Sequence, residues 1–284
     1  MSNKISFKKS IAVILSFVLL FTILFPNKIH AENTKTTSDV LVEKIEDNAN
    51  QLTLKGTKNG SSLILTQDKK TLKISMAGDA KLFEENSAQS FSTNANNSSE
   101  TIPTPANYNV EINDIKSNEE IDATFTNIET GKSVDTLHNT TGEVTPQLVF
   151  LVPLGVIIGE ALLASLIATA VAIEFGGIAY ATIGAVKDKV RNDRYNHYAA
   201  KIVQGNVWIG PSLSLTQAAA RLGGISIQEN NVWSKNSDLA EAVAELAGGG
   251  REAFGPELQV NQKEGIFYYV HFHTWNRAGG HSFF

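Results

Sequence analysis

The chain ends in the stretch GIFYYVHFHTWNRAGGHSFF, residues 265–284, which has the pattern of two strands joined by a turn. Successive side chains of a strand point to opposite faces, so one face of residues 265–274 is apolar and the other carries His271 and His273. The polar, glycine-containing segment that follows favours a turn that brings His281 back beside this pair. The sequence therefore predicts that three of the six histidines gather on one terminal hairpin.

Residues 187–284 have the composition of a separate domain. After a charged break at 187–194, the pattern predicts a strand over 201–209 and two helices, over 214–222 and 238–247. The first helix has a capping-box spacing at its start, Ser214 with Gln217, and a glycine at its end. Three strand-like runs follow, over residues 257–260, 265–274 and 281–284. Helices ahead of a terminal antiparallel sheet predict an α+β domain.

Residues 149–186 are almost wholly apolar and rich in glycine and alanine, with only Glu160 and Glu174 charged. The segment is long enough to cross a membrane once, or to form a helical hairpin that turns near Gly176-Gly177. Gly155 and Gly159 have the spacing that lets membrane helices approach closely. Two interpretations stay open, a segment that interacts with a target-cell membrane and a buried helix pair of a soluble protein.

Residues 1–31 have the pattern of a secretory signal peptide. Three lysines precede an apolar run of 15 residues from Ile11 to Phe25, and the small residue Ala31 follows at a position suited to cleavage. The run is shorter than the ~20 residues that span a bilayer. We therefore expect a secreted protein whose mature chain begins near Glu32.

Residues 32–148 are polar and predicted to form a β-rich spacer module. Asn59-Gly60 is a hairpin signal between two alternating runs, and residues 86–106 have the composition of a linker. The predicted strands are residues 52–55, 62–66, 71–76, 108–112 and 121–128. No nucleophile, histidine cluster or glycine-rich loop stands out in this part.

The composition excludes several classes of site. The chain has no cysteine, which rules out a disulfide framework, a cysteine-ligated metal and a cysteine nucleophile. Its 24 basic and 29 acidic side chains form no strongly basic block, which argues against duplex DNA as a partner. An enzyme that acts on single-stranded nucleic acid remains compatible with this charge.

The candidate chemistry lies in the terminal stretch. His271, His273 and His281 have side chains that titrate near neutral pH and so suit general acid and general base catalysis. Arg277 is suited to hold a phosphate through two parallel hydrogen bonds. Asn276 and Trp275 are the candidates for substrate binding, the tryptophan by stacking on a base. This set is sufficient for RNA cleavage without a metal ion, in which the 2′-hydroxyl attacks the neighbouring phosphate.

Other interpretations of the histidines stay open. Three imidazoles and a water molecule also make an open zinc site, and the rings can equally be structural or surface groups. His197 can join the site, although a lone histidine before a strand is more often a packing residue.

The terminal motif HxHxxNRxGGHSFF and the stretch VWIGPSLSLTQAAARL (207–222) resemble secreted toxins of Gram-positive bacteria of the polymorphic-toxin class. The resemblance implies a signal peptide, a variable middle, an apolar segment and a C-terminal toxin domain, and a cognate immunity protein in the producer. Helices ahead of a terminal sheet that carries His and Arg are also the broad plan of metal-independent ribonuclease toxins of the barnase and RelE type.

The sequence thus predicts a secreted toxin that cleaves RNA with residues 187–284. The alternatives are a membrane-active toxin that permeabilises its target through residues 149–186, without enzymatic activity, and a secreted binding or cell-envelope protein.

Overall fold

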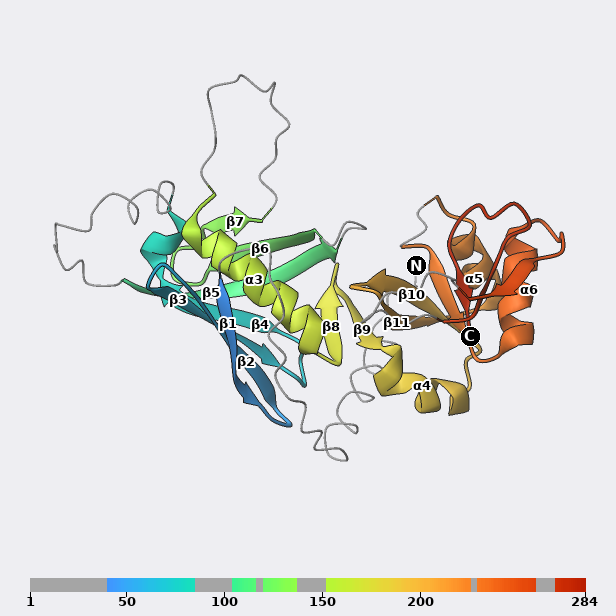
Figure 1. Cartoon of the computed structure of the whole chain (residues 1–284), viewed down its shortest axis with the longest axis horizontal. Helices are drawn as coiled ribbons and strands as arrows, with labels where there is room; N and C mark the ends of the chain where they lie inside the picture. Colours follow the sequence, from blue (N-terminus) through green and yellow to red (C-terminus); the bar gives the residue numbers. More distant parts are fainter. Residues whose placement is uncertain (1–39, 85–103, 116–119, 137–151, 226–228, 259–268) are drawn as a thin grey trace, which may run out of the picture. The chain divides into compact units, whose positions relative to one another are not determined.

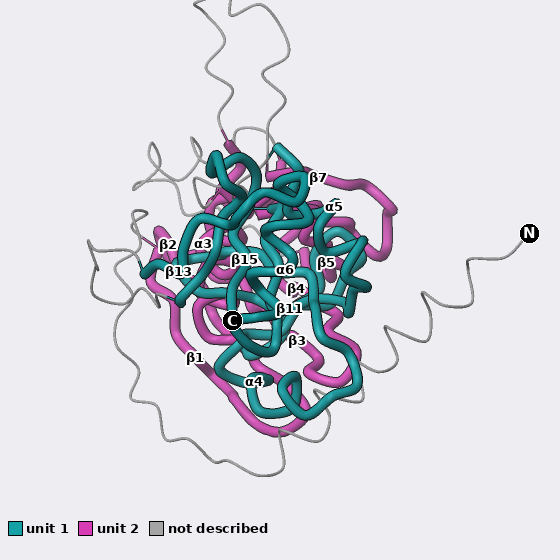
Figure 2. The backbone as a smooth tube through the Cα atoms, turned by 90° about the vertical axis from the view of Figure 1, so that its right-hand side faces the viewer, with its two compact units in different colours: residues 1–21, 116–119, 171–284 teal, residues 22–115, 120–170 magenta. Residues whose placement is uncertain are grey.

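The computed structural model describes residues 40–84, 104–115, 120–136, 152–225, 229–258 and 269–284. These residues form two compact units. The first runs up to Ala170 and is magenta in Figure 2, and the second begins at Val171 and is teal there. The predicted signal peptide and most of the predicted linker at 86–106 lie outside the described residues.

The first unit contains a seven-stranded sheet in which every strand pairs antiparallel with its neighbour in the chain (Figure 1). The strands are β1 (Leu41–Asp47), β2 (Gln51–Lys58), β3 (Ser61–Asp68), β4 (Ile74–Asp79), β5 (Pro105–Ile115), β6 (Ile121–Asn127) and β7 (Ser133–Asp135). A short 3₁₀ helix, η1 (Ala80–Phe83), and helix α3 (Leu154–Thr169) complete the unit. The β-rich prediction is confirmed, and the structure adds β1 and β7 to the predicted strands.

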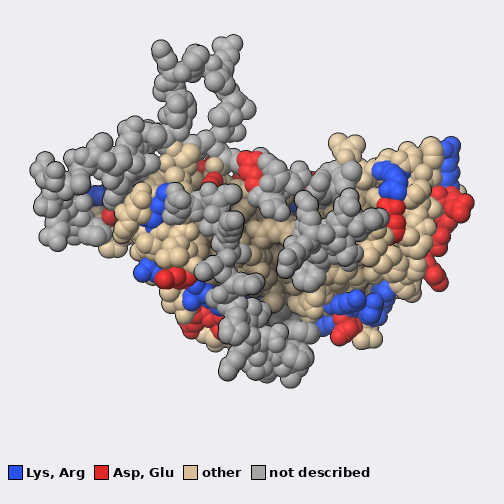
Figure 3. Space-filling view, in the orientation of Figure 1, with Lys and Arg blue, Asp and Glu red and all other residues tan. Residues whose placement is uncertain are grey.

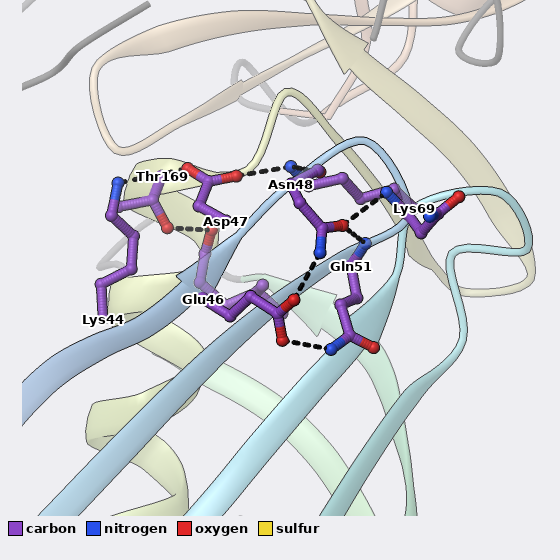
Figure 4. Close-up of polar contacts among 9 residues, drawn as sticks. Lys44, Glu46, Asp47, Asn48, Gln51, Lys69 and Thr169 are labelled. Atoms are coloured by element: carbon purple, nitrogen blue, oxygen red, sulfur yellow. Dashed lines mark hydrogen bonds and ion pairs between the residues drawn. The ribbon is translucent and has the colours of Figure 1, made fainter. Parts of the chain in front are cut away.

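Local turn chemistry explains how the sheet begins. Asn59 and Gly60 both have positive φ, 52° and 79°, as the predicted two-residue hairpin between β2 and β3 requires. At the β1–β2 turn, the Asn48 side-chain oxygen accepts hydrogen bonds from the backbone of Asn50 and Gln51 (Figure 4). Asparagine commonly closes turns in this way, so a short polar loop is enough to join these strands.

Helix α3 packs on the first sheet, mainly against β2, β3 and η1. Its small residues are what allow the close approach. A Cβ at Gly155 would lie 2.8 Å from the Phe83 ring, and one at Gly159 would lie 2.8 Å from the Phe125 ring. The two glycines with the spacing of membrane helix pairs therefore contact aromatic rings of the protein's own core.

We expect Gly159→Ala to lower the free energy of unfolding of the first unit. The new methyl group meets the fully buried Phe125, and overpacking costs about 1–3 kcal/mol against a gain in helix propensity of about 1 kcal/mol. Gly184→Ala, in helix α4 of the second unit, is the control and should leave the unfolding of the first unit unchanged, because a Cβ there meets nothing within 4 Å. Denaturant titration of both variants checks the prediction, and equal stability of the two would contradict it.

The second unit is built on an eight-stranded mixed sheet, in the order β13-β14-β15-β12-β10-β11-β9-β8. Its strands are β8 (Ala172–Phe175), β9 (Ile178–Thr182), β10 (His197–Val203), β11 (Asn206–Leu213), β12 (Asn231–Ser234), β13 (Phe254–Glu257), β14 (His271–His273) and β15 (Ser282–Phe283). All pairs are antiparallel except β12 with β15, which run parallel. The α+β class is confirmed, and the predicted antiparallel pairing holds among the terminal strands β13, β14 and β15, while β12 joins β15 in parallel.

Three helices cover this sheet, α4 (Ile183–Asn192) on one face and α5 (Leu215–Leu222) with α6 (Ser237–Ala247) on the other. Strand alternation separates the two cores. Val232 packs with α5 and α6, whereas the next residue, Trp233, packs with α4. The predicted helix at 214–222 is confirmed with its complete Ser214–Gln217 capping box, and the second helix begins one residue early because Asn236 caps it.

Residues 149–186 do not form the expected helical hairpin. The described part contains helix α3, then the hairpin β8–β9, then the start of α4. The turn does lie at Gly176-Gly177, where both φ angles are positive, but it joins two strands. No helix among the described residues is long and apolar enough to cross a membrane.

Two further sequence predictions in the second unit were wrong. The strand expected over 201–209 is the hairpin β10–β11, because Gln204 and Gly205 adopt φ values of 47° and 70° and reverse the chain. The charged break expected at 187–194 is largely helical, since residues up to Asn192 belong to α4. The sequence did not indicate the hairpin because its turn contains a glutamine, and it did not indicate the helix because one face of the helix is charged.

Candidate functional site

The three terminal histidines lie together in the second unit. His271 and His273 project from the same face of β14, and their ring centroids are 4.9 Å apart. Strand β15 pairs antiparallel with β14 and places His281 at ring-centroid distances of 4.8 Å from His271 and 4.7 Å from His273. One ring nitrogen from each histidine lies within 4.8 Å of the other two.

Strand β13 adds Glu257 to this cluster, a residue that the sequence analysis did not single out. Its carboxylate lies 3.1 Å from His273 Nε2 and 3.6 Å from His271 Nε2. The antiparallel register of β13 with β14 sets Glu257 opposite His271. A single glutamate at the start of a predicted strand carries no local signal, because only this pairing brings it to the histidines.

Arg277 binds the same carboxylate from the turn after β14. Its two terminal nitrogens lie 2.8 and 2.6 Å from the two oxygens of Glu257, a bidentate pair. The turn itself is tight, with Arg277 at φ 59° and its backbone N–H donating to Thr274 O. The two kinds of side chain that the sequence predicts as partners of a phosphate, histidine and arginine, therefore both lie beside the carboxylate of Glu257.

The two predicted substrate-binding residues differ in their surroundings. The Asn276 side-chain oxygen accepts hydrogen bonds from the Thr274 hydroxyl and the Ala278 backbone, so it shapes the turn. Trp275 is 46 % exposed, with the Arg251 guanidinium 4.2 Å from its ring centroid. Of the two, Trp275 is the side chain with a broad face accessible to a ligand.

Asn231, which is fully buried on β12, positions His281. The Asn231 side-chain oxygen accepts hydrogen bonds from the backbone N–H of His281, at 2.7 Å, and from His281 Nδ1, at 2.8 Å. His271 Nδ1 likewise donates to the carbonyl oxygen of Tyr269, at 2.8 Å. The two acceptors are oxygen atoms that carry no hydrogen, so each histidine must carry its hydrogen on Nδ1. In the neutral ring, Nε2 is then the nitrogen that can accept a proton.

The protonation of the cluster follows from its contacts. The hydrogen bonds from Arg277 hold the pKa of Glu257 below its usual range, with support from His273 and His271. Burial lowers the pKa of His273, and the neighbouring His271 and Arg277 act in the same direction against Glu257. At neutral pH the site therefore contains a carboxylate and a neutral His273, whose buried Nδ1 has no hydrogen-bond partner among the described residues.

Among the residues that the structure describes, the group suited to hold a metal ion is these same three histidines. Tetrahedral zinc with Zn–N bonds of about 2.0–2.1 Å needs nitrogens about 3.3 Å apart. The three ligand nitrogens here all lie within 4.8 Å of one another.

His197 does not extend the cluster. It is 4 % exposed on β10, and its Nδ1 lies 2.9 Å from the Ser234 hydroxyl on β12. Burial also lowers the pKa of this imidazole. These contacts assign it to the packing between two central strands.

The charged side chains of the second unit differ in sign along the face drawn in Figure 3. On the face shown in Figure 3, basic and acidic side chains are interspersed, with no broad field of one sign.

No family model, no curated protein and no solved structure matches this chain.

Proposed function

We propose that the protein is an exported bacterial toxin whose second unit, here called the C-terminal unit, cleaves RNA by metal-independent acid–base chemistry. The observation that carries the proposal is the convergence of Glu257, Arg277 and three histidines at the β13–β14–β15 edge. A carboxylate, an arginine and several imidazoles are the groups that transesterification at a phosphate requires. The pattern of residues 1–31 and the toxin-like terminal motif support export and toxicity.

In the proposed reaction, Glu257 takes the proton from the ribose 2′-hydroxyl, and the 2′-oxygen forms a bond to the neighbouring phosphorus. The bond from phosphorus to the 5′-oxygen breaks, and a protonated histidine gives its proton to that leaving oxygen. We assign this acid role to His281, the most exposed of the three rings. Arg277 stabilises the charge on the phosphate, and His273, whose Nε2 lies 3.1 Å from the carboxylate, orients Glu257.

Activity is assigned to the C-terminal unit rather than to residues 149–186. Helix α3 has most of its side chains buried, and the described residues after it form the hairpin β8–β9 and the start of α4. A producer of such an enzyme would need an immunity protein that blocks the β13–β15 edge, since the active groups lie there.

The test uses the chain without residues 1–31. We expect it to arrest growth when it is expressed inside a bacterial cell, and to cleave single-stranded RNA in vitro to products with a 2′,3′-cyclic phosphate. RNA with 2′-O-methyl groups should stay intact, because it lacks the attacking hydroxyl. A chelator should leave the rate unchanged.

Two results would overturn the proposal. Growth arrest with intact RNA would move the activity to another target. Loss of cleavage in a chelator, with recovery on addition of Zn²⁺, would assign the histidines to a metal instead.

A further inference from the structure

An open pocket of about 530 Å³ lies directly beside the candidate site. It is lined by residues 252–257 and by Trp275. Glu257 belongs to both, since its carboxylate binds Arg277 and lies 3.1 Å from His273 Nε2. A ligand that occupies the pocket would therefore place its neighbouring groups at the histidines.

Two exposed aromatic rings distinguish this pocket from the rest of the surface. Among the phenylalanines and tryptophans of the described residues, Phe254 (44 % exposed) and Trp275 (46 %) are the exposed ones, and both line it. Each ring has a guanidinium over one face, Arg277 at 3.9 Å from the Phe254 centroid and Arg251 at 4.2 Å from the Trp275 centroid. Aromatic faces beside arginines are the combination that binds bases and phosphates of single-stranded nucleic acid.

We propose that this pocket binds the nucleobase next to the scissile phosphate, with the base stacked against Trp275 and Phe254. The inference rests on the proposed function, because it identifies the part of the RNA that the site recognises. Glu252 also lines the pocket, and a carboxylate only accepts hydrogen bonds. Guanine presents two adjacent N–H donors on its Watson–Crick edge, so it is the base that can donate two hydrogen bonds to one carboxylate.

The backbone conformation at Gly255 holds the pocket beside the candidate site. Gly255 has φ +136°, and a Cβ there would lie 2.9 Å from the carbonyl oxygen of His271. Only glycine lets the strand pass this closely, so the residues on either side of it, Phe254 and Pro256, form the pocket wall against β14.

The test measures binding by calorimetry, with no cleavage required. The probe is the 2′-O-methyl dinucleotide GpA, which lacks the attacking hydroxyl, and the comparison probe is the same compound with an abasic first sugar. Trp275→Ala and Phe254→Ala should each weaken GpA binding about ten-fold or more, the usual effect of losing one stacking contact. Trp275→Phe should retain most of the affinity, and Leu215→Ala, which removes an exposed side chain outside the pocket, should bind as the unchanged chain does.

The abasic probe separates the pocket from the phosphate site. We expect Trp275→Ala to leave its binding unchanged, whereas Arg277→Ala should weaken both probes. We also expect Glu252→Gln to reduce the preference for GpA over the UpA analogue. GpA binding unaffected by both alanine variants would overturn the inference even if RNA is cleaved. Base-dependent binding without any RNA cleavage would instead leave the pocket assignment standing and remove the proposed function.

Discussion

Glu257→Gln is expected to lower the rate of RNA cleavage by about 10²–10⁴-fold, the usual contribution of a positioned general base. The substitution keeps the size of the side chain and its ability to accept a hydrogen bond from Arg277, but it removes the group that takes the 2′-hydroxyl proton. His281→Ala should cause a loss of similar size, because it removes the acid that protonates the leaving oxygen. Initial rates on a short single-stranded RNA measure both effects.

Controls separate catalysis from folding. Glu174→Gln makes the same chemical change at an exposed position on β8, far along the sheet order from β13, and should retain full activity. The Glu257–Arg277 pair is partly exposed, so its loss should change the free energy of unfolding by about 1 kcal/mol or less. A Glu257→Gln variant that folds and cleaves RNA within three-fold of the unchanged chain would remove glutamate from the mechanism.

Gly279→Ala is expected to lower the free energy of unfolding of the C-terminal unit by about 2–4 kcal/mol and to abolish cleavage. Gly279 has φ +86°, and a Cβ there would lie 2.0 Å from the backbone oxygen of Leu222. The next residue, Gly280, donates its N–H to that same oxygen at 2.9 Å. The backbone therefore has to shift, and His281 is displaced with it.

Gly249→Ala is the matched control for this effect. Gly249 also has a positive φ, +74°, but a Cβ there meets nothing within 4 Å. Gly249→Ala should lower the free energy of unfolding by only the cost of a positive φ for alanine, about 1–2 kcal/mol, and leave cleavage intact. Thermal or denaturant unfolding of the two variants measures the difference, and equal losses would show that the contact with Leu222 has no role.

The Gly-Gly pair of the terminal motif thus has a structural meaning that the sequence did not reveal. From the sequence, it indicated only a turn before His281. In the fold, it lets the chain pass against the end of α5, where Gly280 bonds to Leu222, so that His281 can reach Asn231. The partners lie far away in the chain, and no local pattern could identify them.

Features that depend on neighbouring residues were predictable. The capping box of α5, the Asn59-Gly60 turn and the shared face of His271 and His273 all follow from backbone geometry over a few residues. The apolar character of residues 149–186 was equally clear. The sequence did not show which surface buries this segment. The hydrophobic effect is non-directional, and the surfaces that cover the segment lie on other strands.

The sequence by itself determined the secondary-structure signals, the absence of cysteine chemistry and the histidine pair on β14, since each depends on residue type and short-range geometry. Only the tertiary structure decided that α3 packs on one sheet while β8 and β9 join another, and that Glu257 and Asn231 complete the histidine cluster. The physical reason is strand register: β13 and β12 bring these two residues to β14 and β15 through pairing between distant segments, and that pairing is set by the packing of the whole unit.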